Sequence, residues 1–235
     1  MKFLVLNLKA YPESGGLAGY RLAKVAGAVA KNVATLAGVK VILIPQLPDV
    51  SRFSEDLRGT TCDVFSPHAD ALEAGAHTGF VPPESVKAAG AQGILLNHSE
   101  HRVNSRHMAF VSRRAKELNL ATLFCGRNVR EAARVAKLYS PTMVAVEPPE
   151  LIGGDVSVST AQPEVVREGV RAIRKAHRST LALVGAGVRT PEDVRKSIEL
   201  GADGVLLAHA FVKAADPEAF LKQLVLSMAA GASKK

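Results

Sequence analysis

The sequence contains no tryptophan, only three tyrosines and only two cysteines among its 235 residues. Two cysteines are too few for a disulfide scaffold, so we expect a protein of the reducing cytoplasm. Aromatic residues make up 5% of the chain, which argues against a glycosidase. Such an enzyme usually presents aromatic platforms to its sugar, and it also needs two opposed carboxylates.

Long hydrophobic runs are missing as well. No apolar stretch reaches about 18 residues without a charged or turn residue, so the sequence predicts no membrane span. The first apolar run, at residues 3–6, is too short for the core of a signal peptide and lacks a small-residue cleavage site. Hydrophobic residues still make up 47% of the chain, which excludes disorder and allows a large buried core.

Basic residues outnumber acidic ones by 30 to 22, which gives a formal net charge of +8. Such an excess can indicate a nucleic acid, a membrane surface or an anionic substrate as partner. Several of the basic residues share one face of an expected helix: Arg167, Arg171, Arg174, Lys175 and Arg178. No stacking aromatic residue lies among them, so we expect a solvated helix face and no nucleic acid or membrane partner.

One pattern repeats along the whole chain: a short, continuously apolar run followed by a segment with helical spacing. The runs lie at 3–8, 39–44, 62–65, 93–96, 120–124, 143–146, 181–184 and 204–207, and the helical segments at 17–36, 49–57, 82–89, 105–118, 129–138, 163–177, from 190 onward and at 217–228. Continuously apolar strands are typical of a parallel sheet that is covered on both faces. Eight such repeats predict one (β/α)8 TIM barrel, an α/β fold, as a single domain over 1–235. An open doubly wound sheet would produce the same pattern.

Polar residues follow three of the apolar runs, where the carboxyl ends of barrel strands form the site in this fold. Asn7 lies near the end of the first run and Lys9 directly follows it, His98 and Glu100 follow the fourth run, and Glu147 follows the sixth. A carboxylate base, a histidine electrophile and a fixed cation suit the abstraction of a proton next to a carbonyl group.

The loops after the last three runs have the features of a phosphate site. Gly153 lies in the loop after the sixth run, Gly187 follows the seventh, and Ala208 and His209 follow the eighth. Backbone N–H groups in such loops can bind a phosphate dianion. Together with the strand-end residues, these loops predict chemistry on a small phosphorylated sugar.

Motifs at four places resemble those of the triosephosphate isomerase family, in the short form typical of archaea. They are Asn7-Leu8-Lys9, Ala76-His77-Thr78-Gly79, Asn97-His98-Ser99-Glu100 and Glu147-Pro148-Pro149-Glu150-Leu151-Ile152-Gly153. They occur in the family's order and the match runs over nearly the whole chain. The resemblance implies an enzyme of glycolysis and gluconeogenesis that interconverts D-glyceraldehyde 3-phosphate and dihydroxyacetone phosphate through an enediolate, without a cofactor or metal.

The resemblance also implies a role for each strand-end residue. Glu147 would take the proton from the substrate carbon, and an uncharged His98 would polarise the carbonyl, a pairing for which this family is the best-known example. Lys9, with Asn7 beside it, would offset negative charge on the enediolate and the phosphate. Glu100 would be a hydrogen-bond or ion-pair partner within the site.

Phosphate binding is implied for Gly153, in a lid that excludes water on closing, and for Gly187. The sequence departs from the family at two places. Many members carry a serine where this chain has Gly187, and a pair of small residues where it has Ala208 and His209. The His209 side chain could crowd the phosphate, turn away or add a charge-assisted contact.

A long third loop, at about 66–80, indicates a function or an interface. The resemblance implies that Thr78 in this loop approaches the site of a neighbouring subunit. The chain would then form a homodimer or, as short members of the family often do, a homotetramer.

Other interpretations remain open. A different phosphate-binding barrel enzyme would share the last two loops, and a non-catalytic basic binding protein would leave the polar set without a purpose. A metal site is a further interpretation of His68, His77, His98, His101 and His107. These histidines lack the His-Glu-x-x-His frame of zinc proteases, so we expect no metal.

Three further residues lie near the expected site without a definite role. Cys125 directly follows the fifth run, and we expect it to serve packing rather than nucleophilic chemistry. Arg189 and Lys213 either attract a dianion or are solvated surface charges.

Overall fold

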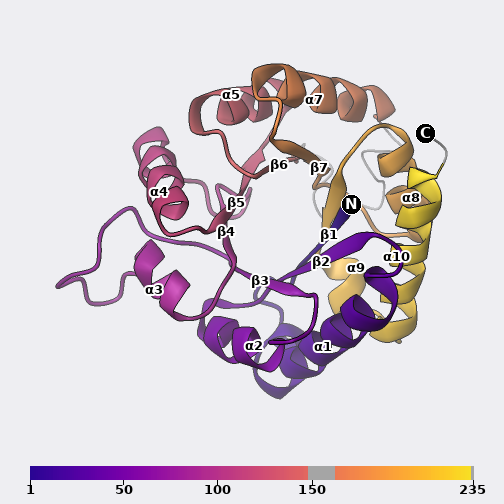
Figure 1. Cartoon of the computed structure of the whole chain (residues 1–235), viewed down its shortest axis with the longest axis horizontal. Coiled ribbons are helices and arrows are strands. Elements are labelled where there is room, and N and C mark those ends of the chain that lie inside the picture. Colours follow the sequence, from indigo (N-terminus) through magenta and orange to yellow (C-terminus); the bar gives the residue numbers. More distant parts are fainter. Residues whose placement is uncertain (148–161, 234–235) are drawn as a thin grey trace.

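The computed structural model describes residues 1–147 and 162–233, and in these ranges eight parallel strands close into a barrel (Figure 1). The strands are β1 (Lys2–Asn7), β2 (Val39–Ile44), β3 (Asp63–Ser66), β4 (Gly93–Leu96), β5 (Ala121–Gly126), β6 (Met143–Val146), β7 (Leu181–Val184) and β8 (Gly204–Leu207). Each strand pairs with the next, and β1 also pairs with β8, where Phe3 lies opposite Gly204 and Leu6 opposite Leu207. This closure confirms the expected barrel and excludes the open sheet.

Helices surround the barrel on its outside (Figure 1). They are α1 (Gly16–Val29), α2 (Val50–Asp56), α3 (Pro83–Ala88), α4 (Ser105–Glu117), α5 (Val129–Tyr139), α7 (Pro163–Ala176), α8 (Pro191–Glu199), α9 (His209–Val212) and α10 (Pro217–Ala232), with short turns η1 (Pro12–Ser14), η2 (Ala30–Ala34) and η3 (Leu47–Asp49). Among the helices of the described ranges, none combines the length and the apolar character needed to span a membrane.

The strand and helix boundaries follow the sequence pattern closely. Every strand begins and ends within two residues of the expected run. The helix expected over 17–36 passes from α1 into η2, which has the wider hydrogen-bonded turns of a π-helix. The single-turn helix α9, directly after β8, was not expected, because one turn is too short to produce a helical pattern in the sequence.

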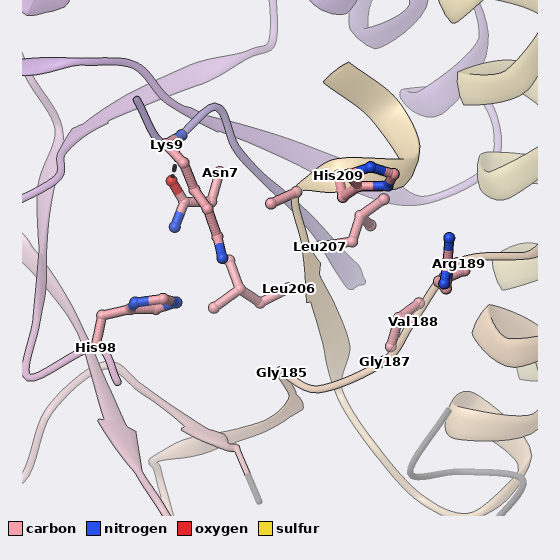
Figure 2. A pocket seen from close by; sticks show the side chains of 11 residues that line it. Asn7, Lys9, His98, Gly185, Gly187, Val188, Arg189, Leu206, Leu207 and His209 are labelled. Atoms are coloured by element: carbon pink, nitrogen blue, oxygen red, sulfur yellow. Dashed lines mark hydrogen bonds between the residues drawn. The ribbon is translucent and has the colours of Figure 1, made fainter. Parts of the chain in front are cut away.

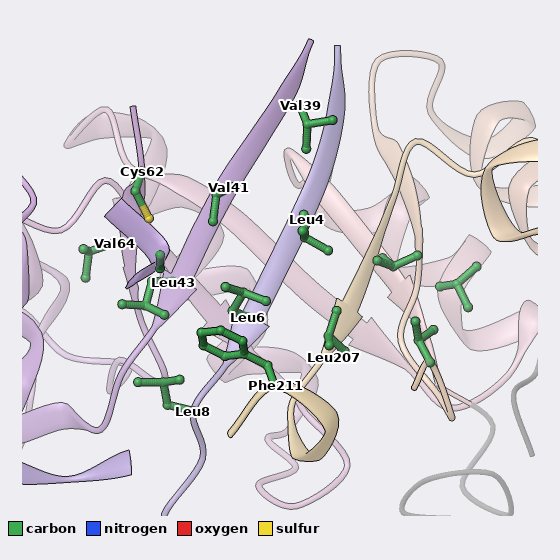
Figure 3. Close-up of a cluster of buried hydrophobic side chains, with 14 of the residues drawn as sticks. Leu4, Leu6, Leu8, Val39, Val41, Leu43, Cys62, Val64, Leu207 and Phe211 are labelled. Atoms are coloured by element: carbon green, nitrogen blue, oxygen red, sulfur yellow. The ribbon is translucent and has the colours of Figure 1, made fainter. Parts of the chain in front are cut away.

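The strand side chains alternate between two apolar layers. In β1, Leu4 and Leu6 belong to the layer between strands and helices, where Phe211 of α9 also packs (Figure 3). Val5 belongs instead to the cluster inside the barrel, together with Phe65 of β3. Because successive strand residues point to opposite faces and both faces are buried, the strands appear as continuously apolar runs.

Residues 67–82 form the long loop between β3 and α3, which projects from the side of the barrel (Figure 1). Its base is held by two hydrogen bonds: the Asp70 N–H donates to the Val81 carbonyl at 2.8 Å, and the Val81 N–H donates to Asp70 Oδ2 at 2.7 Å. Residues 73–80, including Thr78, are all exposed. The expected third loop is therefore present, and its role at a partner subunit remains a prediction.

Candidate active site

A cavity opens at the carboxyl ends of the strands (Figure 2). Its lining consists of Asn7, Lys9, His98, Gly185, Gly187, Val188, Arg189, Leu206, Leu207, Ala208 and His209. The barrel thus brings together residues that we expected at four strand ends. Glu147 adjoins this group, because its Oε1 lies 3.5 Å from Nε2 of His98. Gly153 lies outside the described residues.

Lys9 is held across the mouth of the barrel by its neighbours. Its backbone has a left-handed φ of +49°, and its N–H donates to Oδ1 of the buried Asn7 at 2.9 Å, the dashed line in Figure 2. Its Nζ donates to Oε1 of Glu100 at 2.6 Å, which links the end of β1 to the loop after β4. The Glu100 side chain is therefore an ion-pair partner within the candidate site.

His98 is arranged to act as a neutral hydrogen-bond donor. Its Nδ1 accepts a hydrogen bond from the Glu100 N–H at 3.2 Å, so a neutral ring carries its proton on Nε2. That nitrogen faces Glu147. Burial lowers the pKa of His98 to about 4, and the charges of Lys9 and Arg102 add to this effect while Glu100 opposes it. The ring is therefore uncharged at neutral pH.

Glu147 directly follows β6 and is fully buried. Its N–H donates to the Gly126 carbonyl at 2.8 Å, but neither carboxylate oxygen accepts a well-formed hydrogen bond from a described residue. Burial raises the pKa of Glu147 to about 7, against the opposing effects of the Cys125 thiol, Arg102 and Lys9. Such a carboxyl group is partly ionised near neutral pH, and its carboxylate form has enough proton affinity to act as a base.

Gly185 leaves the space that Glu147 occupies. A Cβ atom at Gly185 would lie 2.6 Å from Cγ of Glu147 and 3.0 Å from its Oε1, which is closer than side chains pack. In the sequence Gly185 directly follows the seventh apolar run, where a glycine usually marks only a tight turn. Its contact with Glu147 joins residues from two strands, so no sequence signal other than the strand-end glycine could have indicated it.

The expected phosphate loops line the other side of the cavity. Gly187 has a left-handed φ of +66°, and His209 is the first residue of α9. The His209 ring lies edge-on to Tyr11, with the ring centroids 6.1 Å apart. Arg189 lines the same cavity, whereas Lys213 is engaged in an ion pair with Glu13.

Two further residues near His98 were not among the site residues expected from the sequence. Arg102 donates from Nη1 to the Asn97 carbonyl at 3.0 Å, and the same Nη1 lies 3.8 Å from Oε2 of Glu131. Asn97 itself is buried and has a left-handed φ of +60°. Asn97 stood within a recognised motif and Arg102 follows it by five residues, so proximity to His98 was the available signal.

Three of the other histidines gather beside the site. The rings of His68 and His101 stack with centroids 4.3 Å apart, and His107 lies 5.4 Å from His68. Within residues 1–147 and 162–233, no group of three or more His, Cys, Asp or Glu side chains is arranged to hold a metal ion. Cys125 is fully buried, and burial raises its pKa well above the ordinary range, so its thiol stays protonated.

Comparison with known proteins identifies the family. The model of the family described as triosephosphate isomerase matches residues 2–226. The chain is 41% identical to the triosephosphate isomerase of Methanosarcina barkeri over 225 residues, which cover 96% of this chain and 98% of the relative. It is 42% identical to that of Caldivirga maquilingensis over 221 residues, with 94% and 95% covered. The chain therefore belongs to the triosephosphate isomerase family and is an isomerase built on a (β/α)8 barrel.

Proposed function

We propose that this enzyme interconverts D-glyceraldehyde 3-phosphate and dihydroxyacetone phosphate through an enediolate, with Glu147 as base and His98 as electrophile. The observation that carries this proposal is the buried contact between Glu147 Oε1 and His98 Nε2, which lie 3.5 Å apart. Burial at this place raises the pKa of Glu147 to about 7 and lowers that of His98 to about 4. At neutral pH the pair supplies a carboxylate that can accept a proton and a neutral imidazole that can donate a hydrogen bond.

The reaction would proceed by proton transfers at carbon, through Glu147, and at oxygen, through His98, on either side of the enediolate. Glu147 takes a proton from the carbon next to the carbonyl and later returns it to the neighbouring carbon. His98 donates from Nε2 to the carbonyl oxygen and then takes the proton of the adjacent hydroxyl group. Lys9, held by Asn7 and Glu100, offsets the negative charge that develops on the oxygens.

The phosphate would lie at the opposite side of the cavity, against the loops after β7 and β8. Backbone N–H groups at Gly187 and Ala208 would bind it, and His209 would add a charge-assisted contact when protonated. The family resemblance adds a backbone contact from Gly153. The reaction belongs to glycolysis and gluconeogenesis, and we assign it to the cytoplasm because the two cysteines, Cys62 and Cys125, are both free and buried.

We also propose that the chain works as a homodimer or homotetramer in which the loop 67–82 of one subunit docks at the site of another. A second cavity adjoins the first, sharing Lys9 and His98, and has apolar walls from Pro45 and Leu47. Phe80 of the loop is 55% exposed, so it has apolar surface to bury in such a contact. Thr78 would then approach the partner subunit's site.

The test of the catalytic assignment is Glu147→Gln, measured in a coupled assay of triose phosphate interconversion. We expect kcat to fall by about three orders of magnitude or more, because an amide cannot accept the carbon-bound proton. Near wild-type turnover in this variant would contradict the role of Glu147. No isomerase activity of the wild-type chain at any temperature up to its melting point would overturn the proposed function.

A stability measurement on the same variant separates lost chemistry from lost folding. The pKa of Glu147 is about 7 in the folded state against an ordinary value of 4.5, so ionisation destabilises the wild-type fold as pH rises through this range. The variant Glu147→Gln should therefore gain stability relative to the wild type as pH rises. The difference between their free energies of unfolding should be larger at about pH 8 than near pH 4.5, by up to about 3 kcal/mol. Denaturant unfolding at the two pH values measures this difference, and a pH-independent difference would contradict it.

A further inference from the structure

We propose that Asn97 is a positioning residue for the reaction: its side-chain amide ties the loop that carries His98 to the end of the neighbouring strand β5. This inference rests on the proposed role of His98. Asn97 is only 2% exposed, and its Nδ2 donates to the Cys125 carbonyl at 2.9 Å. Its Oδ1 accepts from the Val103 N–H at 3.2 Å, so both ends of the amide are engaged.

The hydrogen bond from the Asn97 side chain to the Cys125 carbonyl extends the barrel beyond its strand pairing. The ladder between β4 and β5 ends where Leu96 lies opposite Phe124. The next residue on each strand, Asn97 and Cys125, is joined by the side-chain amide instead. The end of β4 is therefore held to β5 up to the residue that precedes His98.

The peptide group between Asn97 and His98 is held on its other side as well. Arg102 donates to the Asn97 carbonyl at 3.0 Å, and the φ of +60° at Asn97 turns the chain sharply at this point. His98 then has its ring fixed at Nδ1 by the Glu100 N–H. The direction of the Nε2–H bond thus depends on a backbone that Asn97 anchors.

The same anchor lies close to the attachment of Glu147. Cys125 is followed by Gly126, whose carbonyl accepts the Glu147 N–H at 2.8 Å. A single buried amide therefore connects the backbone of the electrophile to the strand end that holds the base. A displacement of about 1 Å between such groups can lower a rate by about 100-fold.

Two explanations for an asparagine at this position make different predictions. Asparagine tolerates the left-handed conformation, but glycine adopts it more easily. If only the backbone conformation mattered, Asn97→Gly would be fully active. If the amide positions His98, the same substitution keeps the turn and loses the anchor.

The test compares Asn97→Gly with Asn119→Gly. Asn119 also has a left-handed backbone, with φ +54°, and is exposed at the end of α4, before the start of β5. We expect Asn97→Gly to lower kcat by about 10- to 100-fold with KM changed less than about threefold, because binding at the phosphate loops is untouched. Asn119→Gly should retain wild-type kcat and KM.

A second readout is the nitrogen-15 spectrum of the His98 ring. In the wild type we expect one tautomer with the proton on Nε2, and in Asn97→Gly a shift of both ring nitrogens toward tautomer averaging. If Asn97→Gly does not fold, Asn97→Asp serves instead, because it keeps the acceptor for Val103 and loses the donor to Cys125. Wild-type kcat or an unchanged His98 spectrum in the folded variant would overturn the proposal.

The spectrum also separates this inference from the proposed function. It needs no turnover, so a chain without triose phosphate isomerase activity would contradict the proposed function while leaving the His98 signals to decide on Asn97. An active wild type with unaltered His98 signals in Asn97→Gly would contradict the role of Asn97 and leave the proposed function intact.

Discussion

Glu147 and His98 show how burial acts in opposite directions on an acid and a base. Burial disfavours the charged form of each group, so it raises the pKa of Glu147 to about 7 and lowers that of His98 to about 4. The order of affinities is the reverse of that of the free side chains, because the carboxylate now holds a proton more tightly than the imidazole. Their position at strand ends could be predicted from the sequence, but these pKa shifts depend on burial in the folded barrel.

The pKa of Glu147 predicts the pH dependence of the enzyme. Activity requires the ionised carboxylate, so kcat/KM should fall as pH drops through about 7, whereas His98 stays neutral down to about pH 4. The measurement is the kcat/KM profile between about pH 5 and pH 9. The substrate phosphate also titrates, near pH 6.

Glu147 and the substrate phosphate could both contribute to this fall in kcat/KM, and a titration of the free enzyme reports on Glu147 alone. Carbon-13 labelled glutamate carboxyl signals of the wild type, compared with those of Glu147→Gln, should reveal one carboxyl group that titrates near 7. A Glu147 signal that titrates near its ordinary value would contradict the expected burial effect.

At the scale of the elements, the start of α8 has an N-terminal cap that can be recognised in the sequence and is present in the structure. Thr190-Pro191-Glu192-Asp193 is a sequence typical of a helix start, with threonine as cap and proline in the first turn. In the structure the Thr190 Oγ1 accepts from the Asp193 N–H at 3.2 Å, and Asp193 Oδ2 accepts from the Thr190 N–H at 2.9 Å. This reciprocal capping box satisfies donors that would otherwise be unpaired at the helix start. By contrast, α9 is one turn whose residues carry no comparable signal.

Removal of this cap should cost a measurable amount of stability. We expect Thr190→Ala to lower the free energy of unfolding by about 1 kcal/mol, because the Asp193 N–H loses its acceptor. Thr190→Ser, which keeps the hydroxyl group, is the matched control and should remain close to wild type. Urea unfolding of both variants provides the measurement, and equal stabilities of the alanine and serine variants would refute the capping contribution.

At the scale of the whole molecule, the excess of basic residues is spread over helix faces. Arg167 pairs with Glu164, and Arg174 donates to Asp203 at 2.8 Å. Arg195 bridges two carboxylates of its own helix, α8. These contacts agree with the solvated helix faces expected from the sequence. Most of the acids that pair with these cations lie three or four residues away on the same helix. Such ion pairs can therefore be predicted from the spacing of the charges in the sequence.

The subunit arrangement gives a prediction at the same scale. We expect the wild type to sediment as a dimer or tetramer at micromolar concentration, and Phe80→Asp to shift it toward a monomer with lower activity, because a charge on the loop 67–82 would be desolvated in the partner's cavity. Leu36→Asp is the control, since Leu36 is 87% exposed and lies before β2, away from this loop. A wild-type monomer with full activity at this concentration would contradict the proposed docking.

The sequence by itself determined the eight strands, most of the helices and the strand ends that carry Lys9, His98 and Glu147, because hydrophobic periodicity and strand-end chemistry are local properties of the chain. Only the tertiary structure decided that β1 pairs with β8, since an open sheet has the same local pattern. It also decided the fit of Gly185 against Glu147 and the hydrogen bond from the Asn97 side chain to the Cys125 carbonyl. These features join residues that are far apart in the chain, and their geometry exists only once the barrel has closed.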